Sequence, residues 1–325
     1  MQEKAGFDSL HMTEAGQLPS VTVVIPCFNQ GRYLAAALKS VWDQSHRPAE
    51  CIVVDDGSTD DTATIAARFG ARVIRQPNRG VSAARNAGLA VAHGDLIVFL
   101  DADDVLLRDA LAMEAVALWS NEHAAAVVTR CEAMDEAGTP LPVQHHEIDP
   151  ENLYRDWLSR NFVWTPGAAM FRRSALVEAG GFVEDLGPAA DYAIYLLLAR
   201  DGRVAFVGGC AVRYRQHPGS MSRDPALMLR ATLQVLRRES VEGPPWVRRE
   251  VRRARRVWCA WYGEQIVHDL RVRWHTRTWG ARQLKATLTL LRNCPALVLR
   301  HVSRKMRRAV VPAPSSSSTP GRASR

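Results

Sequence analysis

The first hundred residues alternate between short apolar segments rich in β-branched side chains and stretches whose apolar residues recur at helical spacing. Residues 21–26, 51–54, 72–75 and 96–100 are predicted strands, and the stretches between them are predicted helices. This alternation implies a parallel sheet with helices on both faces. The predicted fold class is therefore α/β, with a mostly parallel sheet.

A polar cluster follows three of the four predicted strands. In parallel sheets the carboxyl ends of the strands share one edge, and ligands bind beyond that edge. We therefore expect the three clusters to converge. They are Pro26 with Phe28 and Asn29, Asp55 with Asp56, and Asp101-Ala102-Asp103 followed by Asp104.

The third cluster is costly to bury unless a cation meets its carboxylates. A divalent metal that carries a phosphate group is one such partner, because hard cations prefer oxygen ligands. A solvated acidic turn is the alternative, because Asp is common in turns. The chain has no GxGxxG after its first strand and no GxxxxGK[ST], which argues against a dinucleotide-binding dehydrogenase and a P-loop NTPase. Phosphates would then depend on a metal and on Arg side chains such as Arg79 and Arg85.

Two later features carry candidate chemistry. Asp191 stands near the start of an apolar, helical run at residues 189–199. Its carboxylate either complements the helix dipole or acts as a general base. His145-His146 lies in a turn-rich segment, where solvation is favoured over metal binding.

Six segments in this order resemble the family 2 glycosyltransferases with the GT-A fold. The resemblance covers about residues 20–222 and is carried by VVIPCFNQGRYL, IVVDDGSTDDT, NRGVSAARNAGL, GDLIVFLDADD, GGFVEDLGPAADYAIYLLLAR and YRQHPGSMS. It implies transfer of a sugar, with inversion, from a UDP-, GDP- or dTDP-sugar donor. The implied acceptor is a hydroxyl of a glycan or a lipid-linked molecule in cell-envelope or exopolysaccharide biosynthesis.

The resemblance also implies a role for individual residues, with Mg²⁺ or Mn²⁺ as the cofactor. Asp191 matches the catalytic base, and His217 matches a position near the diphosphate or the metal. The implied donor site comprises Pro26, Phe28, Asn29, Asp55, Asp56, Arg79, Arg85, Asp101, Ala102 and Asp103, of which Asp101 and Asp103 would also bind the metal, Asp103 most directly.

The sequence departs from the family pattern at one position. Ala190 stands where the family usually has Glu before the base. A catalytically weakened transferase that serves as a scaffold therefore remains an alternative. A sugar nucleotidyltransferase is another, although the Gly-rich activation loop of that class is not visible near the first strand.

Charge divides the chain into parts. Residues 225–325 contain 22 Lys or Arg and five Asp or Glu, whereas residues 1–224 contain 20 and 29. This asymmetry suggests two roles. The predicted parts are a flexible leader at 1–20, the catalytic domain at 21–224, a basic helical extension at 225–311 and a disordered tail at 312–325.

The basic extension interleaves arginines with tryptophans, which fits three partners. Contact with an anionic membrane surface is favoured, packing on the catalytic domain comes next, and single-stranded nucleic acid is least favoured. Six dispersed cysteines without a CxxC pair indicate a reducing compartment, and the first twenty residues lack the apolar core of a signal peptide. We therefore expect a cytoplasmic protein, in peripheral contact with the inner face of the membrane.

Overall fold

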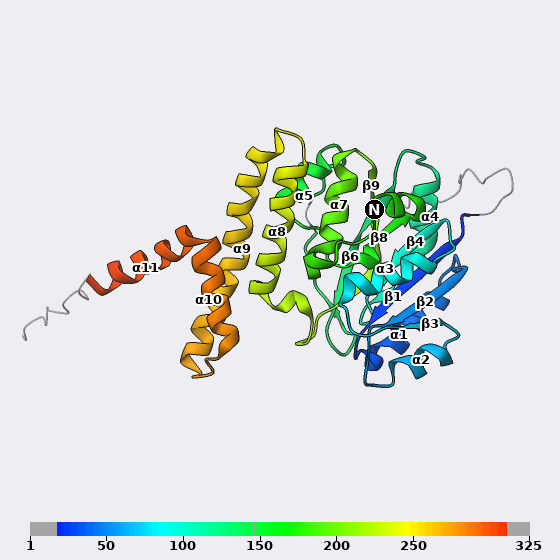
Figure 1. Ribbon diagram of the computed structural model, residues 1–325, viewed down its shortest axis with the longest axis horizontal. Coiled ribbons are helices and arrows are strands. Elements are labelled where there is room, and N and C mark those ends of the chain that lie inside the picture. The colour runs from blue at the N-terminus through cyan, green and yellow to red at the C-terminus, as the bar shows by residue number, and fades with distance from the viewer. Residues whose placement is uncertain (1–17, 146, 311–325) are drawn as a thin grey trace, which may run out of the picture. The chain divides into compact units, whose positions relative to one another are not determined.

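The computed structural model describes residues 18–145 and 147–310, without the side chains of 304–310 (Figure 1). The predicted disordered tail lies outside these residues, as does the predicted leader except for its last three positions. The described residues form two compact units that divide within helix α9 (Val247–His275), after Trp258.

The alternating pattern of the first hundred residues is confirmed. Its strands pair in parallel in the order β3-β2-β1-β4. The elements are β1 (Val21–Cys27), α1 (Gly31–Trp42), β2 (Glu50–Asp55), α2 (Thr62–Arg68), β3 (Arg72–Arg75), α3 (Val81–Val91) and β4 (Leu96–Phe99).

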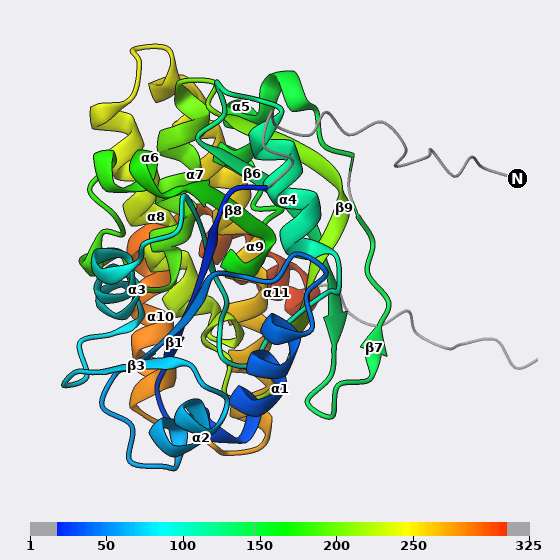
Figure 2. The ribbon, with the colours of Figure 1, turned by 90° about the vertical axis from the view of Figure 1, so that its right-hand side faces the viewer.

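Helices cover both faces of this parallel half, which explains why its central strands are apolar throughout. Every residue of β1 is buried, and Figure 2 shows α1 on one side of the strand and α3 on the other. Helix α3 approaches β1 closely at Gly88, where an added Cβ would lie 2.3 Å from a methyl carbon of Val24. The start of α3 lies at the carboxyl edge of the sheet because the helix follows the parallel strand β3.

The second half of the sheet is mixed. It continues as β8-β6-β9-β5, with β8 antiparallel to both β4 and β6, and with β7 paired to β6. Its strands are β5 (Val105–Leu106), β6 (Ala126–Met134), β7 (Pro140–Leu141), β8 (Ala169–Arg172) and β9 (Val204–Arg215). Its helical elements are α4 (Ala110–Trp119), η1 (Pro150–Asn152), α5 (Leu153–Ser159), η2 (Pro166–Ala168), α6 (Arg173–Glu178), η3 (Glu184–Ala189), α7 (Ala190–Arg200) and η4 (Met221–Arg223).

Strand β9 is longer than the sequence predicts. The apolar run at residues 204–207 predicts only the first four residues of this strand. The structure continues the strand to Arg215, with a register shift against β6 in this region. Gly209 lies against Met113: an added Cβ would lie 2.5 Å from the Met113 sulfur, so that side chain would have to shift. The extension carries the chain to the carboxyl edge of the parallel half.

Helix α8 (Pro225–Glu242) belongs to the first unit, so the chain divides later than the predicted boundary at residue 224. Its apolar face, with Leu229, Leu233 and Leu236 buried, packs against η3 and α7.

The second unit contains the remainder of α9, then α10 (Ala281–Asn293) and α11 (Pro295–Val310). Its small core includes Ile266, Ala286, Leu290 and Leu297. Among the described residues, no helix is both long enough and apolar enough to span a membrane.

Candidate active site

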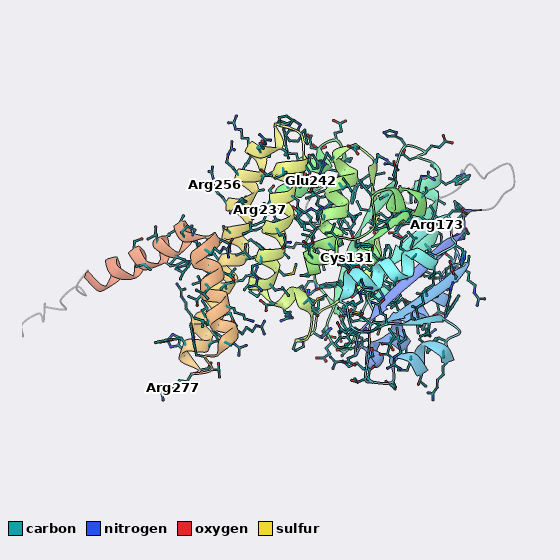
Figure 3. All side chains as sticks on the ribbon, viewed as in Figure 1. Cys131, Arg173, Arg237, Glu242, Arg256 and Arg277 are labelled. Carbon is teal, nitrogen blue, oxygen red and sulfur yellow. The ribbon has the colours of Figure 1, made fainter. Side chains whose placement is uncertain are left out.

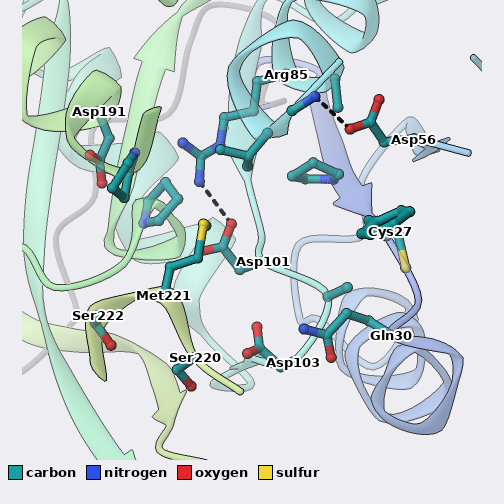
Figure 4. A pocket seen from close by; sticks show the side chains of 18 of the residues that line it. Cys27, Gln30, Asp56, Arg85, Asp101, Asp103, Asp191, Ser220, Met221 and Ser222 are labelled. Carbon is teal, nitrogen blue, oxygen red and sulfur yellow. Dashed lines mark hydrogen bonds and ion pairs between the residues drawn. The ribbon is translucent and has the colours of Figure 1, made fainter. Parts of the chain in front are cut away.

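A cavity of about 390 Å³ opens at the carboxyl edge of the parallel strands (Figure 4). Eight of the residues predicted for the site line it: Pro26, Phe28, Asp56, Arg85, Asp101, Ala102, Asp103 and Asp191. Four do not: Asn29, Asp55, Arg79 and His217. Residues the sequence had not singled out also form the wall, among them Trp164, Tyr214, Met221 and Met228.

In the turn after β1, the ring of Phe28 lies at the cavity, whereas the side-chain amide of Asn29 holds the turn in place. Phe28 is 46% exposed, although large apolar side chains are usually buried. Asn29 adopts a left-handed conformation with φ 52°, which Asn tolerates better than most residues. Its side-chain oxygen accepts a hydrogen bond of 2.8 Å from the backbone N–H of Thr59. Asn29 therefore joins two loops, and Phe28 is the group that faces the ligand space.

The two carboxylates after β2 point in different directions. Asp55 accepts a hydrogen bond of 2.7 Å from the N–H of Ser58 and pairs with Arg75 at 3.5 Å, away from the cavity. Asp56 lies on the cavity wall and accepts hydrogen bonds from the N–H groups of Arg79 and Gly80, at 2.9 and 2.8 Å. Asp56 thus fixes the loop that leads into α3. The side chain of Arg79 itself is exposed and pairs with Glu184 at 3.3 Å.

Arg85 on α3 lies at the centre of the cavity wall and is almost fully buried. Its guanidinium donates to Asp101 at 2.9 Å (Figure 4). Burial lowers the pKa of Arg85, but the charges of Asp101 and Asp191 more than offset this, so its pKa is raised and it stays protonated. Its Nε–H has no hydrogen-bond partner among the described residues. The site therefore holds a permanent cation between two carboxylates.

Asp103 makes a direct contact with His217, although the histidine is not on the cavity wall. The ring Nε2 of His217 lies 2.8 Å from the Asp103 carboxylate. The other ring nitrogen, Nδ1, accepts from the N–H of Gly219, so a neutral His217 carries its proton on Nε2 and donates it to Asp103. Burial, and then the charge of Asp101, raise the pKa of Asp103, and the His217 hydrogen bond opposes them.

The acidic loop after β4 is anchored by a residue that the sequence did not reveal. Arg215, at the end of β9, donates from Nε to the carbonyl of Asp103 at 2.8 Å and from its guanidinium to the carbonyl of Glu136 at 2.9 Å. Its backbone N–H donates to the buried carboxylate of Asp104 at 2.8 Å. Because Arg215 lies 112 positions from Asp103, only the long strand β9 brings them together.

Tyr33 on α1 completes this support. Its ring lies 5.0 Å from the guanidinium carbon of Arg215 and 5.1 Å from the ring of His217, and its hydroxyl donates to Glu136 at 2.9 Å. One residue from the first helix therefore holds the two side chains that contact Asp103. The sequence signal for it was only an aromatic residue in a helical pattern, which usually indicates core packing.

Asp191 is the carboxylate on the α7 side of the cavity. Burial raises its pKa from 3.8 to about 6, and the charge of Arg85 opposes the increase. One carboxylate oxygen accepts from the N–H of Tyr192 at 2.8 Å. Ala190, before it, is completely buried, so a longer acidic side chain at that position would have to be accommodated inside the protein.

Comparisons with known proteins now decide the family. The profile described as Glycosyl transferase family 2 matches residues 22–180. A putative teichuronic acid biosynthesis glycosyltransferase of Bacillus subtilis, TuaG, is 31% identical over 213 residues, which cover 63% of this chain and 82% of TuaG. The chain belongs to glycosyltransferase family 2.

Solved structures support the GT-A fold of this glycosyltransferase. S. aureus TarS 1–349 in complex with UDP-GlcNAc is similar with a TM-score of 0.60 at 18% identity, over 83% of this chain and 79% of that one. A mannosyltransferase of Pyrobaculum calidifontis in complex with GDP-Man and Mn²⁺ is similar with a TM-score of 0.53 at 19% identity, over 88% and 90%. The matched part of this chain covers 65% of the length of another curated relative and less than a third of the length of three further relatives.

The side chains of Asp101 and Asp103 fit a divalent cation that takes its further ligands from a substrate. Asp101 and Asp103 both line the cavity, and each is partly exposed. Their mutual repulsion contributes to the raised pKa of Asp103, and a bound cation would relieve it. No group of three or more His, Cys, Asp or Glu side chains suited to a metal occurs in the part of the chain that the structure describes. A cation held by Asp101 and Asp103 would therefore need further ligands that the described side chains do not supply.

His145 lies near the thiol of Cys210, at 4.0 Å, and burial lowers its pKa. His146 lies outside the described residues.

Proposed function

We propose that this family 2 glycosyltransferase moves a sugar from a nucleoside diphosphate sugar to an acceptor hydroxyl by single displacement, with inversion. One observation carries the proposal: a buried carboxylate with a raised pKa, Asp191, lines the same cavity as the acidic pair Asp101 and Asp103. In Figure 4, Arg85 and Asp101 lie between Asp191 and Asp56. The cavity thus offers separate positions for a leaving group and for an attacking hydroxyl.

The parallel half of the sheet would hold the donor. The exposed ring of Phe28 offers a face on which a nucleobase can stack. Asp56 and the loop that it fixes border the same space, and Arg85 provides positive charge for the diphosphate. The structures that resemble this chain were solved with UDP-GlcNAc or GDP-Man, which supports a nucleotide sugar as the donor class.

Asp191 would take the proton of the acceptor hydroxyl as its oxygen attacks the anomeric carbon. The new bond joins that oxygen to the anomeric carbon, the bond to the diphosphate breaks, and the bonding electrons leave with the diphosphate. A carboxyl with a pKa of about 6 is ionised at neutral pH and remains basic enough to accept a proton. Because the enzyme forms no covalent bond to the sugar, one displacement inverts the anomeric configuration.

Asp101 and Asp103 are the residues that would hold Mg²⁺ or Mn²⁺, and the Mn²⁺ in the structure of the similar mannosyltransferase supports a divalent cation as the cofactor. When bound, such a cation stabilises the negative charge that develops on the departing diphosphate. His217 and Arg215 would keep Asp103 in position by hydrogen bonds to its carboxylate and carbonyl.

The proposed acceptor is a glycan or a lipid-linked molecule, in the biosynthesis of a cell-envelope or extracellular polysaccharide. The similarity to TuaG, which is named for teichuronic acid biosynthesis, supports this class. All six cysteines lie in the described residues, and none forms a disulfide bond there, which supports a reducing compartment. We place the protein in the cytoplasm, with its basic carboxyl-terminal residues toward the inner face of the membrane.

The test is a donor screen of the full chain. Release of nucleoside diphosphate is measured for UDP-GlcNAc, UDP-glucose, GDP-mannose and dTDP-rhamnose, each with Mn²⁺ or Mg²⁺. We expect turnover of one nucleotide class, and loss of turnover in Asp103→Ala and in Asp191→Ala.

The matched control is Asp201→Ala, because Asp201 is an exposed carboxylate at the other end of α7. This variant is expected to turn over the donor like the unmodified chain. Full activity in Asp103→Ala or Asp191→Ala would remove the assigned role. No binding of any donor, by thermal shift, would favour the scaffold alternative.

A further inference from the structure

Helix α10 carries apolar side chains on two faces. Ala286 and Leu290 are buried in the core of the second unit. Leu284, Leu288 and Leu291 are 56%, 55% and 52% exposed. Spacings of four and three residues place these three leucines on one face of the helix. We call them the α10 leucine stripe.

Packing within the unit does not explain the stripe. A helix that only covers a core needs one apolar face, and its other face is normally polar. The stripe extends along about 10 Å of the helix, which is too ordered for leucines scattered on a surface. Three aliphatic side chains held outward in a row indicate contact with another apolar medium.

Cations border the stripe. Lys285 and Arg292 are exposed one residue after Leu284 and Leu291, so they lie along one side of it. Residues 259–325 contain 13 Lys or Arg and only two Asp or Glu. This charge favours an anionic partner and opposes a second copy of the same strongly basic unit.

The last turn of α9 and the turn that leads into α10 contribute one tryptophan each. Trp274 and Trp279 are 71% and 47% exposed, and their rings meet edge to face with centroids 5.9 Å apart. Figure 3 shows Arg277 at the turn between them in the chain. Exposed tryptophan next to arginine is typical of segments that lie in the headgroup region of a bilayer.

We propose that α10 and the turn before it form a docking surface for an anionic lipid bilayer, in which the leucine stripe enters the headgroup–acyl boundary and Lys285 and Arg292 contact the headgroups. Nucleic acid fits less well, because aliphatic leucines offer no ring on which a base can stack. Composition suggested a membrane contact for the whole basic extension, and the α10 leucine stripe is the part of it that would enter the bilayer. This inference does not depend on the donor chemistry.

The experiment is cosedimentation of the full chain with vesicles made of equal parts phosphatidylcholine and phosphatidylglycerol, and with vesicles of phosphatidylcholine alone. We expect binding to the anionic vesicles that weakens as salt is raised. Leu288→Glu should lower the partition coefficient by about tenfold or more, because it removes the burial of one leucine. The double variant Lys285→Glu/Arg292→Glu should lower binding to the anionic vesicles only.

The matched control is Val177→Glu, which places the same charge at a valine of α6 that is 52% exposed, in the other unit. It should bind vesicles like the unmodified chain. Circular dichroism of each variant checks that it is folded. Donor turnover without vesicles should be unchanged in Leu288→Glu, which separates this inference from the proposed catalytic function.

Three results would overturn the proposal. The first is an unmodified chain that does not bind anionic vesicles, or a Leu288→Glu variant that binds them equally well. The second is light scattering that shows a dimer which Leu288→Glu dissociates, because the stripe would then contact a second copy. The third is a loss of affinity for a polythymidine oligonucleotide in Leu288→Glu with vesicle binding intact.

Discussion

The two halves of the sheet contribute to the candidate active site in different ways. The parallel half, from β3 to β4, brings three loops to one edge through local βα units. The mixed half, from β8 to β5, brings single side chains to that edge from far along the chain. Asp103 and His217, which touch, are 114 positions apart. The first half therefore builds the proposed donor side, and the second supplies the residues that hold the acidic loop and the proposed base.

If the mixed half supplies the base, the largest effect on sugar transfer is expected at Asp191. Asp191→Asn should lower the rate of sugar transfer by about a thousandfold, because general base catalysis contributes roughly 10² to 10⁴. The same variant should be more stable at pH 7.5, by up to about 3 kcal/mol. The measurements are turnover of the donor found in the screen and urea unfolding.

The sign of the stability change follows from the pKa. Burial raises the folded-state pKa of Asp191 above 3.8, to about 6, so its contribution to stability is present below pH 3.8 and is lost as the pH rises through 6. At pH 7.5 the buried charge is a cost that Asn removes. A variant that is both inactive and less stable would show that Asp191 has a structural role instead.

The pH dependence of kcat/KM is a second test of the base that the mixed half supplies. The base must be ionised, so kcat/KM should fall about tenfold for each pH unit below about 6 and level off above it. Arg85 and Asp101 are the charged groups that influence the pKa of Asp191 most: Arg85 lowers it and Asp101 raises it. Weakening the opposing cation by Arg85→Met should move the inflection to higher pH. If the inflection of kcat/KM stayed at the same pH in Arg85→Met, the titrating group would be one other than Asp191.

Arg215 tests whether the mixed half supports the acidic loop. Arg215→Met should lower the free energy of unfolding by about 2–3 kcal/mol, because it removes the charged donor from the part-buried hydrogen bonds to the carbonyls of Asp103 and Glu136. The KM for the donor should rise about tenfold. Urea unfolding and steady-state kinetics measure the two effects.

Arg213→Met is the matched control two residues earlier on β9. Arg213 pairs with Glu132 where both side chains are about 40% exposed, and such pairs contribute about 0–1 kcal/mol. If both variants lost the same stability, the loop would not depend on Arg215 in particular.

The smallest effect is expected at Phe28, on the donor side. Phe28→Ala should raise the KM for the donor about three- to tenfold with little change in kcat, because it removes a stacking face of about 0.5–1.5 kcal/mol. Phe69→Ala is the control, since Phe69 is also exposed but lies at the end of α2. A change in kcat rather than KM would place Phe28 nearer to the reacting atoms than the account does.

The sequence predicted the parallel half because its information is local. Each strand, turn and helix of residues 21–100 has its own pattern, and the position of Asp101 and Asp103 follows from the parallel order. Two roles implied by the resemblance remain proposals that the geometry does not favour, since the side chains of Asn29 and Asp55 bind neighbouring loops.

No local sequence pattern marks the residues that hold the acidic loop in position. Arg215 and Tyr33 gain their meaning only from partners more than a hundred positions away, to which β9 and the 135–136 turn bring them. The length of β9 was itself hidden, because its two glycines look like a turn until Met113 is seen to pack against one of them.

The division of labour is tested most directly by the donor affinity of two variants, measured by calorimetry with the donor from the screen and Mn²⁺. Asp103→Asn keeps an acceptor for His217 but loses the charge, and it should bind the donor at least about tenfold more weakly. Asp191→Asn should bind the donor as tightly as the unmodified chain and yet fail to transfer the sugar. Loss of donor affinity in Asp191→Asn, with normal affinity in Asp103→Asn, would contradict the account.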